Sequence, residues 1–488
     1  MEKEVFGTQC AEVRFGVAQI GGPATIRPVK RTLAAALLVL MAGAAAAAAY
    51  AAAARDREYQ RLLARGEAAL ASQQVGIAVE AFSGAIALKP DAMVAYLKRG
   101  DAYQRHGDLK AALRDLRAAS VLDPTATRPI EQLGDVNVAL GRFDRAADRY
   151  QAYVAIDDRS PRVLYKLALA QYDGGQAQAA IAPLRRALAL DENFAEAHYL
   201  LGLCLEARGQ RRAALGALER AVAIAPSLLE AREALAAAHR AAGRHGEAAR
   251  QLEAIAALDR RRPMRLIAVG MEYADAGRTD LAVTTLVRAA ERFPTSVDVY
   301  SALGEVWLRA AESQDDRVAL GKAIEALRTA VVRGGSGARE LALYGRALLQ
   351  AGQTKEALRA LREAGGKLPV APDTLLDLSH AAERAGRLRE ARDALLQYTT
   401  LLAGGPAPAA VTARIGQLSW RVRDTPTAVV WLRRAAAQTT DAALLADLTE
   451  AELAAGNRTS ARTAIARALG IAPGSARLLR LQARIGRP

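Results

Sequence analysis

The sequence predicts an all-α fold, an α-solenoid built from about twelve helix-turn-helix units. Alanine returns at near-constant intervals, and hydrophobic residues make up 51% of the chain while aromatic residues make up only 5%. This composition favours helices that pack closely at small side chains. The sequence lacks the period-2 runs of Val, Ile and Thr that half-buried strands require. The expected architecture is therefore helical throughout.

A repeat of 34 residues sets the length of each unit. A first column of alanines keeps this interval over seven units, and its later members follow at intervals of 33 to 41 residues. A second column of small or apolar residues lies seven residues later, and a third, mostly glycine, lies twelve residues earlier. Such a period predicts stacked pairs of antiparallel helices. The first column consists of Ala78, Ala112, Ala146, Ala180, Ala214, Ala248, Ala282, Ala323, Ala357, Ala391, Ala428 and Ala461.

The small residues in these columns are expected at contacts between helices. In the stretch GQRRAALGALERAVAIAP, residues 209–226, two alanines stand seven residues apart on one predicted helix. A leucine in their place would overpack the contact at a cost of about 1–3 kcal/mol. Glycines between the two helices of most units predict a left-handed turn. The residues assigned to structural packing are Gly100, Ala112, Ala119, Gly202, Ala214 and Ala221.

The unit at residues 92–124 resembles the tetratricopeptide repeat family. The resemblance extends over about residues 59–475. It implies a right-handed superhelix whose concave groove is lined by the first helix of each unit. It also implies a role in binding. The residues of this unit that fall in register with the family are Tyr96, Gly100, Tyr103, Ala112, Leu116, Ala119 and Pro124.

The repeats divide the chain into segments. An excess of seven residues near 311–319 predicts either an extended helical hairpin or a dedicated contact arm. Glycine- and proline-containing joints at 331–340 and 401–411 predict bends in the array. The expected segments are a disordered N-terminal part at 1–31, an apolar helix at 32–55, units 1–7 at 59–294, units 8–9 at 297–371, units 10–12 at 372–475 and a capping helix at 476–488.

Residues 33–54 form an apolar stretch that is long enough to cross a membrane. Three interpretations stay open: an uncleaved signal-anchor, a secretory signal peptide, and an alanine-rich helix in solution. Basic residues flank both ends of the stretch, so their distribution does not choose an orientation. An N-terminal signal-anchor usually leaves the rest of the chain outside the cytoplasm. This favours a single-pass inner-membrane protein with periplasmic repeats, and leaves the cytoplasmic face as the alternative.

The chain is basic, with 67 Lys and Arg against 52 Asp and Glu. Arginine-rich helix faces in contact with solvent explain this balance, because no block of five like charges occurs. An RNA-binding helical-repeat protein is a disfavoured alternative, since nucleic-acid binding requires clustered basic residues. The two cysteines and five histidines lack the spacing of metal ligands. We expect no metal, no cofactor and no enzymatic activity, because no catalytic motif occurs either.

The predicted functional surface is the groove formed by the first helices of the middle units. Tyrosine and methionine side chains in such a groove suit the capture of an extended peptide or a partner helix. The alternative is ordinary packing between neighbouring first helices. The candidate groove residues are Arg128, Glu131, Asp135, Arg162, Tyr165, Leu169, Tyr172, Tyr199, Leu203, Met264, Ile267 and Met271.

These features lead to a functional hypothesis. The chain is expected to be a protein–protein interaction scaffold, held in the bacterial inner membrane by residues 33–54. By analogy with tethered tetratricopeptide repeat proteins, it would recruit partners for envelope assembly or for exopolysaccharide or pilus export. A secreted periplasmic adaptor, released by signal cleavage, is the main alternative.

Overall fold

The computed structural model describes residues 28–334, 336–402, 405 and 407–486. In these residues the chain forms 25 helices and no strand, which confirms the predicted all-α fold. The disorder predicted for residues 1–31 falls mostly on residues 1–27, which lie outside the described part of the chain.

The helices form two compact units, residues 1–183 and 184–488, and α8 (Ala177–Leu190) contains the boundary between them. The helices of the first unit are α1 (Pro28–Ala71), α2 (Val75–Leu88), α3 (Met93–His106), α4 (Leu109–Leu122), α5 (Thr127–Ala139), α6 (Phe143–Ile156) and α7 (Pro161–Asp173). The helices of the second unit, up to the longest hairpin, are α9 (Ala195–Ala207), α10 (Arg211–Ile224), α11 (Leu229–Ala241), α12 (His245–Leu258), α13 (Pro263–Asp275), α14 (Thr279–Arg292), α15 (Val297–Gln314) and α16 (Arg317–Val332). They are followed by α17 (Ala338–Gln350), α18 (Thr354–Gly365), α19 (Pro372–Arg384), α20 (Leu388–Thr400), α21 (Ala409–Arg421), α22 (Thr425–Gln438), α23 (Ala442–Ala454), α24 (Arg458–Ile471) and α25 (Ala476–Ile485).

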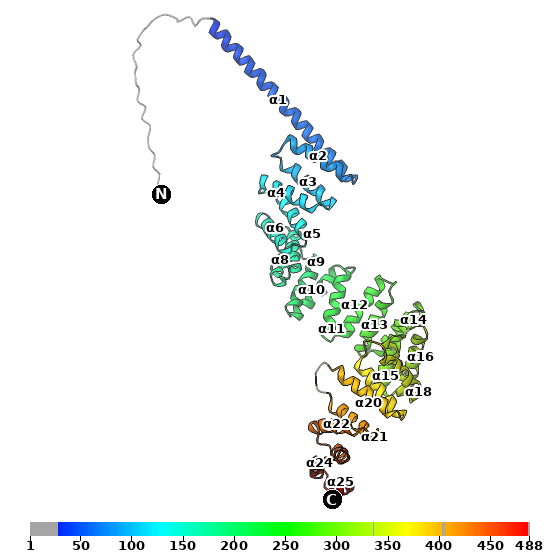
Figure 1. Ribbon diagram of the computed structural model, residues 1–488. Coiled ribbons are helices and arrows are strands. Elements are labelled where there is room, and N and C mark those ends of the chain that lie inside the picture. The colour runs from blue at the N-terminus through cyan, green and yellow to red at the C-terminus, as the bar shows by residue number, and fades with distance from the viewer. Residues whose placement is uncertain (1–27, 335, 403–404, 406, 487–488) are drawn as a thin grey trace, which may run out of the picture. The chain divides into compact units, whose positions relative to one another are not determined.

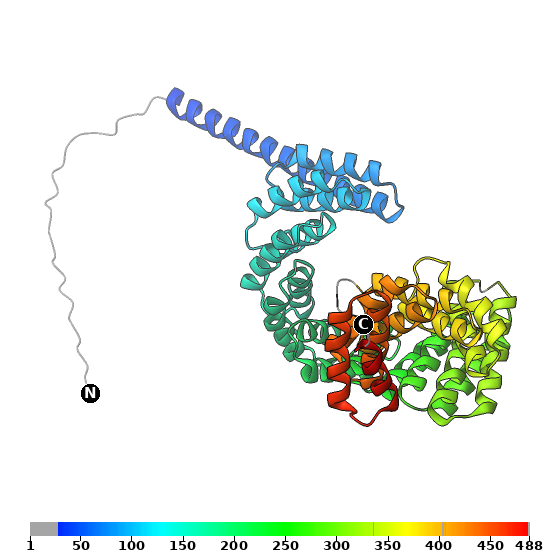
Figure 2. The ribbon, with the colours of Figure 1, turned by 60° about the horizontal axis from the view of Figure 1, so that its bottom comes forward.

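Within each compact unit the helices stack as hairpins (Figure 1). From α1 to α7 and from α9 to α25, each helix contacts the next one along the chain, and several odd-numbered helices of successive hairpins also contact each other, as α13 contacts α15 and α15 contacts α17. Figure 2 shows these hairpins from a second direction. We call the odd-numbered member of each hairpin its first helix. Where contacts join successive hairpins beyond neighbouring helices, they therefore run between first helices, as between α17 and α19.

The alanine column lies at the centre of this packing. All twelve of its alanines are 0% exposed. The glycine column serves the same contacts from the partner helix, because a Cβ atom at Gly202 would lie 2.6 Å from the side chain of Leu218. Both columns therefore keep the two helices of a hairpin at short distance.

The turns inside the hairpins adopt left-handed backbone. At nine of the twelve hairpins the residue with positive φ is glycine, as at Gly107, where φ is 83°. The other three hairpins place Gln73, Asp315 and Arg423 in this conformation. A side chain there costs about 1–2 kcal/mol relative to right-handed backbone, so glycine prevails without being obligatory.

The apolar N-terminal segment does not form a separate element. It belongs to α1, which continues without a break into the first repeat (Figure 1). The large apolar side chains between Leu33 and Met41 are 62–72% exposed, whereas Tyr59, Leu63 and Leu70 are buried against the first hairpin. One face of a single helix thus changes from exposed to packed along its length.

The seven extra residues near 311–319 lengthen one hairpin. They extend α15 to 18 residues and α16 to 16 residues, where most other repeat helices have 13 or 14. The turn between them is short, and the side chain of Asp316 caps α16 by accepting a hydrogen bond from the backbone N–H of Val318 at 2.7 Å. The excess is therefore an extended helical hairpin that carries acidic residues at its tip.

Candidate functional site

The candidate groove residues are distributed over both compact units. Those on α5 and α7 lie in the first unit, and those on α9 and α13 lie in the second. They do not form one described site. In each unit, the surroundings of the side chains determine whether they are available to a partner.

The candidate residues of α5 and α7 pair with one another. Arg162 makes a bidentate ion pair with Glu131, at 2.6 and 2.9 Å. Lys166, which sequence reasoning did not select, reaches both Glu131 at 2.8 Å and Asp135 at 2.7 Å. The hydroxyl of Tyr150 donates to Asp135 at 2.6 Å. We call Glu131, Asp135, Arg162, Lys166 and Tyr150 the closed junction, because its charged groups satisfy one another.

The closed junction shifts the pKa of Glu131 and of Tyr150. Burial would raise the pKa of Glu131, but hydrogen bonds and charge from Lys166 and Arg162 outweigh it, so the pKa lies below its ordinary value. The pKa of Tyr150 is raised by burial and by its hydrogen bond to Asp135. The closed junction is a structural ion-pair cluster at neutral pH.

The apolar and aromatic candidates vary in exposure. Ile267 is buried in the core of the second unit, so it does not face a groove. Met271 is half-buried against the same core, whereas Met264 is 58% exposed. The half-buried candidates are Tyr165, Leu169, Tyr172, Tyr199 and Leu203. Arg128 is exposed.

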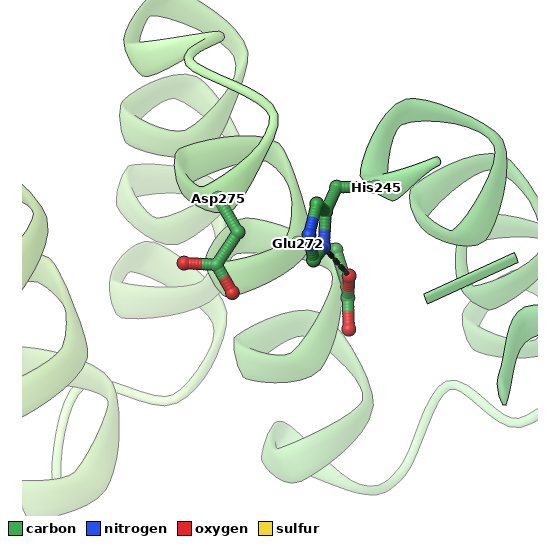
Figure 3. Close-up of side chains that lie close together, drawn as sticks. All are labelled: His245, Glu272 and Asp275. Atoms are coloured by element: carbon green, nitrogen blue, oxygen red, sulfur yellow. Dashed lines mark hydrogen bonds and ion pairs between the residues drawn. The ribbon is translucent and has the colours of Figure 1, made fainter. Parts of the chain in front are cut away.

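A cluster of possible metal ligands joins α12 and α13. His245, Glu272 and Asp275 place one ligand atom each within 4.8 Å of one another (Figure 3). The Nδ1 atom of His245 lies 3.0 Å from Glu272, which also pairs with Arg240. Asp275 pairs with Arg309 at 2.7 Å. Since each carboxylate already has an arginine partner, the arrangement is explained by ion pairs between repeats.

A different surface of the second unit contains neighbouring cavities. A cavity of 380 Å³ lies between α17 and the start of α19, lined by Ala342 and Asp373 among others. A cavity of 520 Å³ follows, lined by Glu312 and Asp377. Arg346 lines both. We call this surface the first-helix groove and define it by Glu312, Ala342, Arg346, Asp373 and Asp377.

The first-helix groove changes character along its length. The smaller cavity is mostly apolar, with Ala338, Ala342, Leu343 and Pro369 in its wall. The residues that line the larger cavity are charged or polar apart from Leu349. A third cavity of 350 Å³ shares Glu312 and continues to the tip of the extended hairpin, where Asp315 and Asp316 lie. The lengthened α15 thus places acidic residues at one end of the groove.

Arg346 is the central cation of the first-helix groove. It donates a hydrogen bond to Asp377 at 2.7 Å, and the pKa of Arg346 is raised because the effects of Asp377, Glu312 and Asp373 outweigh its partial burial. Burial still raises the pKa of Asp377 in spite of this partner. Within the described residues, Glu312 and Asp373 have no ion pair; Glu312 accepts a hydrogen bond from the Gln350 amide at 2.6 Å. The groove therefore holds more negative than positive charge around Arg346.

Family comparisons identify the repeat. Residues 63–127, 268–338 and 344–406 match a tetratricopeptide repeat profile, residues 196–227 match another, and residues 171–209 match a TPR repeat profile. Together these segments cover more than half of the chain. The chain belongs to the tetratricopeptide repeat family. This confirms the resemblance seen at residues 92–124, and the first-helix groove is a surface of tetratricopeptide repeats 8 to 10.

Solved tetratricopeptide repeat structures are similar to parts of the chain. The crystal structure of MamA is 28% identical, covers 32% of this chain and 91% of its own, and has a TM-score of 0.31. YrrB, described as a TPR protein with an unusual peptide-binding site, is 22% identical, covers 39% and 98%, and has a TM-score of 0.35. A tetratricopeptide repeat protein from Parabacteroides merdae is 15% identical, covers 51% and 99%, and has a TM-score of 0.38. No curated protein matches the chain.

Proposed function

We propose that this tetratricopeptide repeat protein is a non-catalytic scaffold that binds an extended partner peptide in the first-helix groove. The supporting observation is the row of cavities from Ala342 to the tip of the extended hairpin, since ligand sites are concave and combine apolar walls with a few polar groups. The apolar cavity suits one aliphatic side chain of the peptide. The acidic end suits a cationic side chain one or more residues away.

The net charge of the first helices supports a cationic partner. In residues 184–488, the eight first helices α9 to α23 carry nine basic and sixteen acidic side chains. The eight second helices α10 to α24 carry nineteen basic and ten acidic side chains. The net charge is therefore −7 on the first helices and +9 on the second helices. A basic peptide is attracted to the first helices and repelled by the second helices.

A peptide panel tests this function. Full-length protein in detergent is titrated with fluorescent nonapeptides that contain one leucine and one arginine at spacings of one to four residues. Matched peptides replace the arginine by glutamate or the leucine by alanine. We expect saturable binding of the arginine peptides, and weaker binding of both replacements.

Groove variants locate the binding. The double variant Glu312→Gln, Asp373→Asn is expected to weaken binding about fivefold, because two carboxylates that attract the arginine of the peptide are neutralised. The double variant Glu325→Gln, Glu356→Gln removes the same charge from the second helices α16 and α18 and should leave the affinity unchanged. Equal losses in the two variants would reject the groove as the binding site.

We further propose that α1 tethers the scaffold to the bacterial inner membrane, with the repeats in the periplasm. One helix in the described residues is long and apolar enough to cross a membrane, and its apolar side chains are exposed. The expected result is that the full chain resists carbonate extraction and that deletion of residues 33–54 releases it. A periplasmic chain that begins after residue 42 would instead support the secreted adaptor.

Reporter fusions after residue 58 test the orientation. A reporter that is active only outside the cytoplasm should give signal, and one that is active only inside should not. We propose envelope assembly, or exopolysaccharide or pilus export, as the process served. Loss of one of these traits on deletion of the gene is the expected outcome, and an unchanged envelope would reject this assignment.

A further inference from the structure

A basic cavity lies on the second unit between α18 and the turn that joins α19 to α20. Its volume is 470 Å³. Its charged lining consists entirely of cations: Lys355, Arg359, Arg362, Arg384 and Arg387. Leu358 and Ala385 supply the apolar part of the wall, and none of the described residues that line the cavity is aromatic. We call the five cations the basic cluster.

The basic cluster has little internal compensation. Glu390 pairs with Arg362 at 2.8 Å and with Arg387 at 3.7 Å. Arg384 donates a hydrogen bond to the backbone carbonyl of Leu349 at 2.9 Å. Within the described residues, Lys355 and Arg359 take part in no ion pair. Among the described residues, one carboxylate thus pairs with two of the five cations, and the mutual repulsion of the cations favours an anion in the cavity.

Other junctions show that the basic cluster is not a general property of the repeat. At the remaining junctions contained in residues 184–488, no more than two of the five equivalent residues are basic. The equivalents at the α10 junction are Arg212, Gly216, Glu219, Ala241 and Arg244, and those at the α12 junction are Gly246, Arg250, Glu253, Asp275 and Arg278. In the first unit, one junction has four basic residues: Lys110, Arg114, Arg117 and Arg142. The arginine content of the chain therefore does not explain a junction at which all five equivalent residues are basic.

We propose that the basic cluster binds a diphosphate group. Guanidinium groups present paired N–H donors that match phosphate oxygens, and four arginines with one lysine can neutralise several charges at once. The absence of aromatic lining leaves no surface for stacking a base, so recognition rests on the diphosphate. A nucleoside diphosphate and a prenyl diphosphate both carry this group.

Calorimetric titration of the full-length protein in detergent with inorganic pyrophosphate tests the proposal. We expect saturable binding that is weakened at least about tenfold in the double variant Lys355→Ala, Arg359→Ala, because two charge-assisted contacts are lost. These side chains are exposed, so the fold should be kept, and circular dichroism checks this. The double variant Lys110→Ala, Arg114→Ala makes the same charge change in the first unit and should alter the Kd less than about twofold.

Two further ligands distinguish the sources of the diphosphate. ADP and geranyl diphosphate are titrated against the same proteins, and tighter binding of one of them than of pyrophosphate identifies the source. Absence of saturable pyrophosphate binding would overturn the proposal. An equal loss of pyrophosphate affinity in the two double variants would also overturn it. Peptide binding in the first-helix groove does not depend on either result, because the two sites share only Arg384.

Discussion

The closed junction and the first-helix groove involve the same repeat positions, but ion pairs fill the first and cavities remain in the second. At the closed junction, Glu131 and Asp135 each meet a cation 31 residues later, Arg162 and Lys166. In the groove, Arg346 meets Asp377, also 31 residues later. The charges of this pair are reversed, but the contact between the two first helices is kept.

The second pair of positions separates the two regions. Ala342 stands where the closed junction has Glu131, and Asp373 stands where it has Arg162. A methyl group cannot reach across the junction, so the ion pair is missing, a cavity remains and Asp373 has no ion pair among the described residues. One small residue at a position that is charged in the closed junction thus leaves a cavity, and this cavity is part of the binding surface that we propose.

The largest expected effect is at the closed junction. Replacing Lys166 by methionine leaves Glu131 and Asp135 near each other without their shared cation, at a cost of about 2–3 kcal/mol for a partly exposed site. Faster hydrogen exchange of α5 and α7 would report this loss. Peptide binding in the first-helix groove should not change.

A second lysine provides the control. Among the described residues, Lys98 pairs with one carboxylate, that of Glu67, which is 53% exposed. The variant Lys98→Met should therefore cost less than about 1 kcal/mol. If Lys166→Met were no more harmful than Lys98→Met, the closed junction would not be the structural cluster that its geometry indicates.

The sequence was sufficient to predict the repeat framework. The column that contains Ala112 and Ala214, and the turn at Gly107, are constrained by close packing and by left-handed backbone. Both constraints act through the residue's own size and recur at a fixed interval. Because these constraints recur in twelve repeats, the fold can be predicted from the sequence alone.

The location of the groove was not predicted, because it depends on pairs of residues in different repeats. Glu131 and Arg162 were selected as groove residues singly, and only their mutual distance shows that they satisfy each other. Ile267 shares their repeat face but is buried. Comparing residues 31 apart would have shown only that Ala342 and Asp373 cannot form the ion pair that Glu131 and Arg162 form.

Restoring the missing pair should close the first-helix groove. In the variant Ala342→Arg, a guanidinium fills the apolar cavity and reaches Asp373, as Arg162 reaches Glu131. We expect peptide affinity to fall about tenfold or more, with stability unchanged within about 0.5 kcal/mol. Ala237→Arg places the same side chain at an exposed first-helix position outside the groove and should leave affinity unchanged. Tight binding by Ala342→Arg would separate the peptide site from this cavity.

The smallest expected effect is an opposite pH response of the two regions. The lowered pKa of Glu131 means that its stabilisation is present above the ordinary value of 4.5 and is lost as pH falls through the folded-state pKa. The raised pKa of Asp377 means that its destabilisation is present at neutral pH and disappears as pH falls from the folded-state pKa to the ordinary value of 3.8. Unfolding midpoints of wild type, Glu131→Gln and Asp377→Asn are compared from pH 7 to acid. As pH falls, the difference in unfolding midpoint between wild type and Glu131→Gln should shrink. The midpoint of wild type should rise relative to that of Asp377→Asn. If both differences changed in the same direction, burial and ion pairing would not differ between the two junctions.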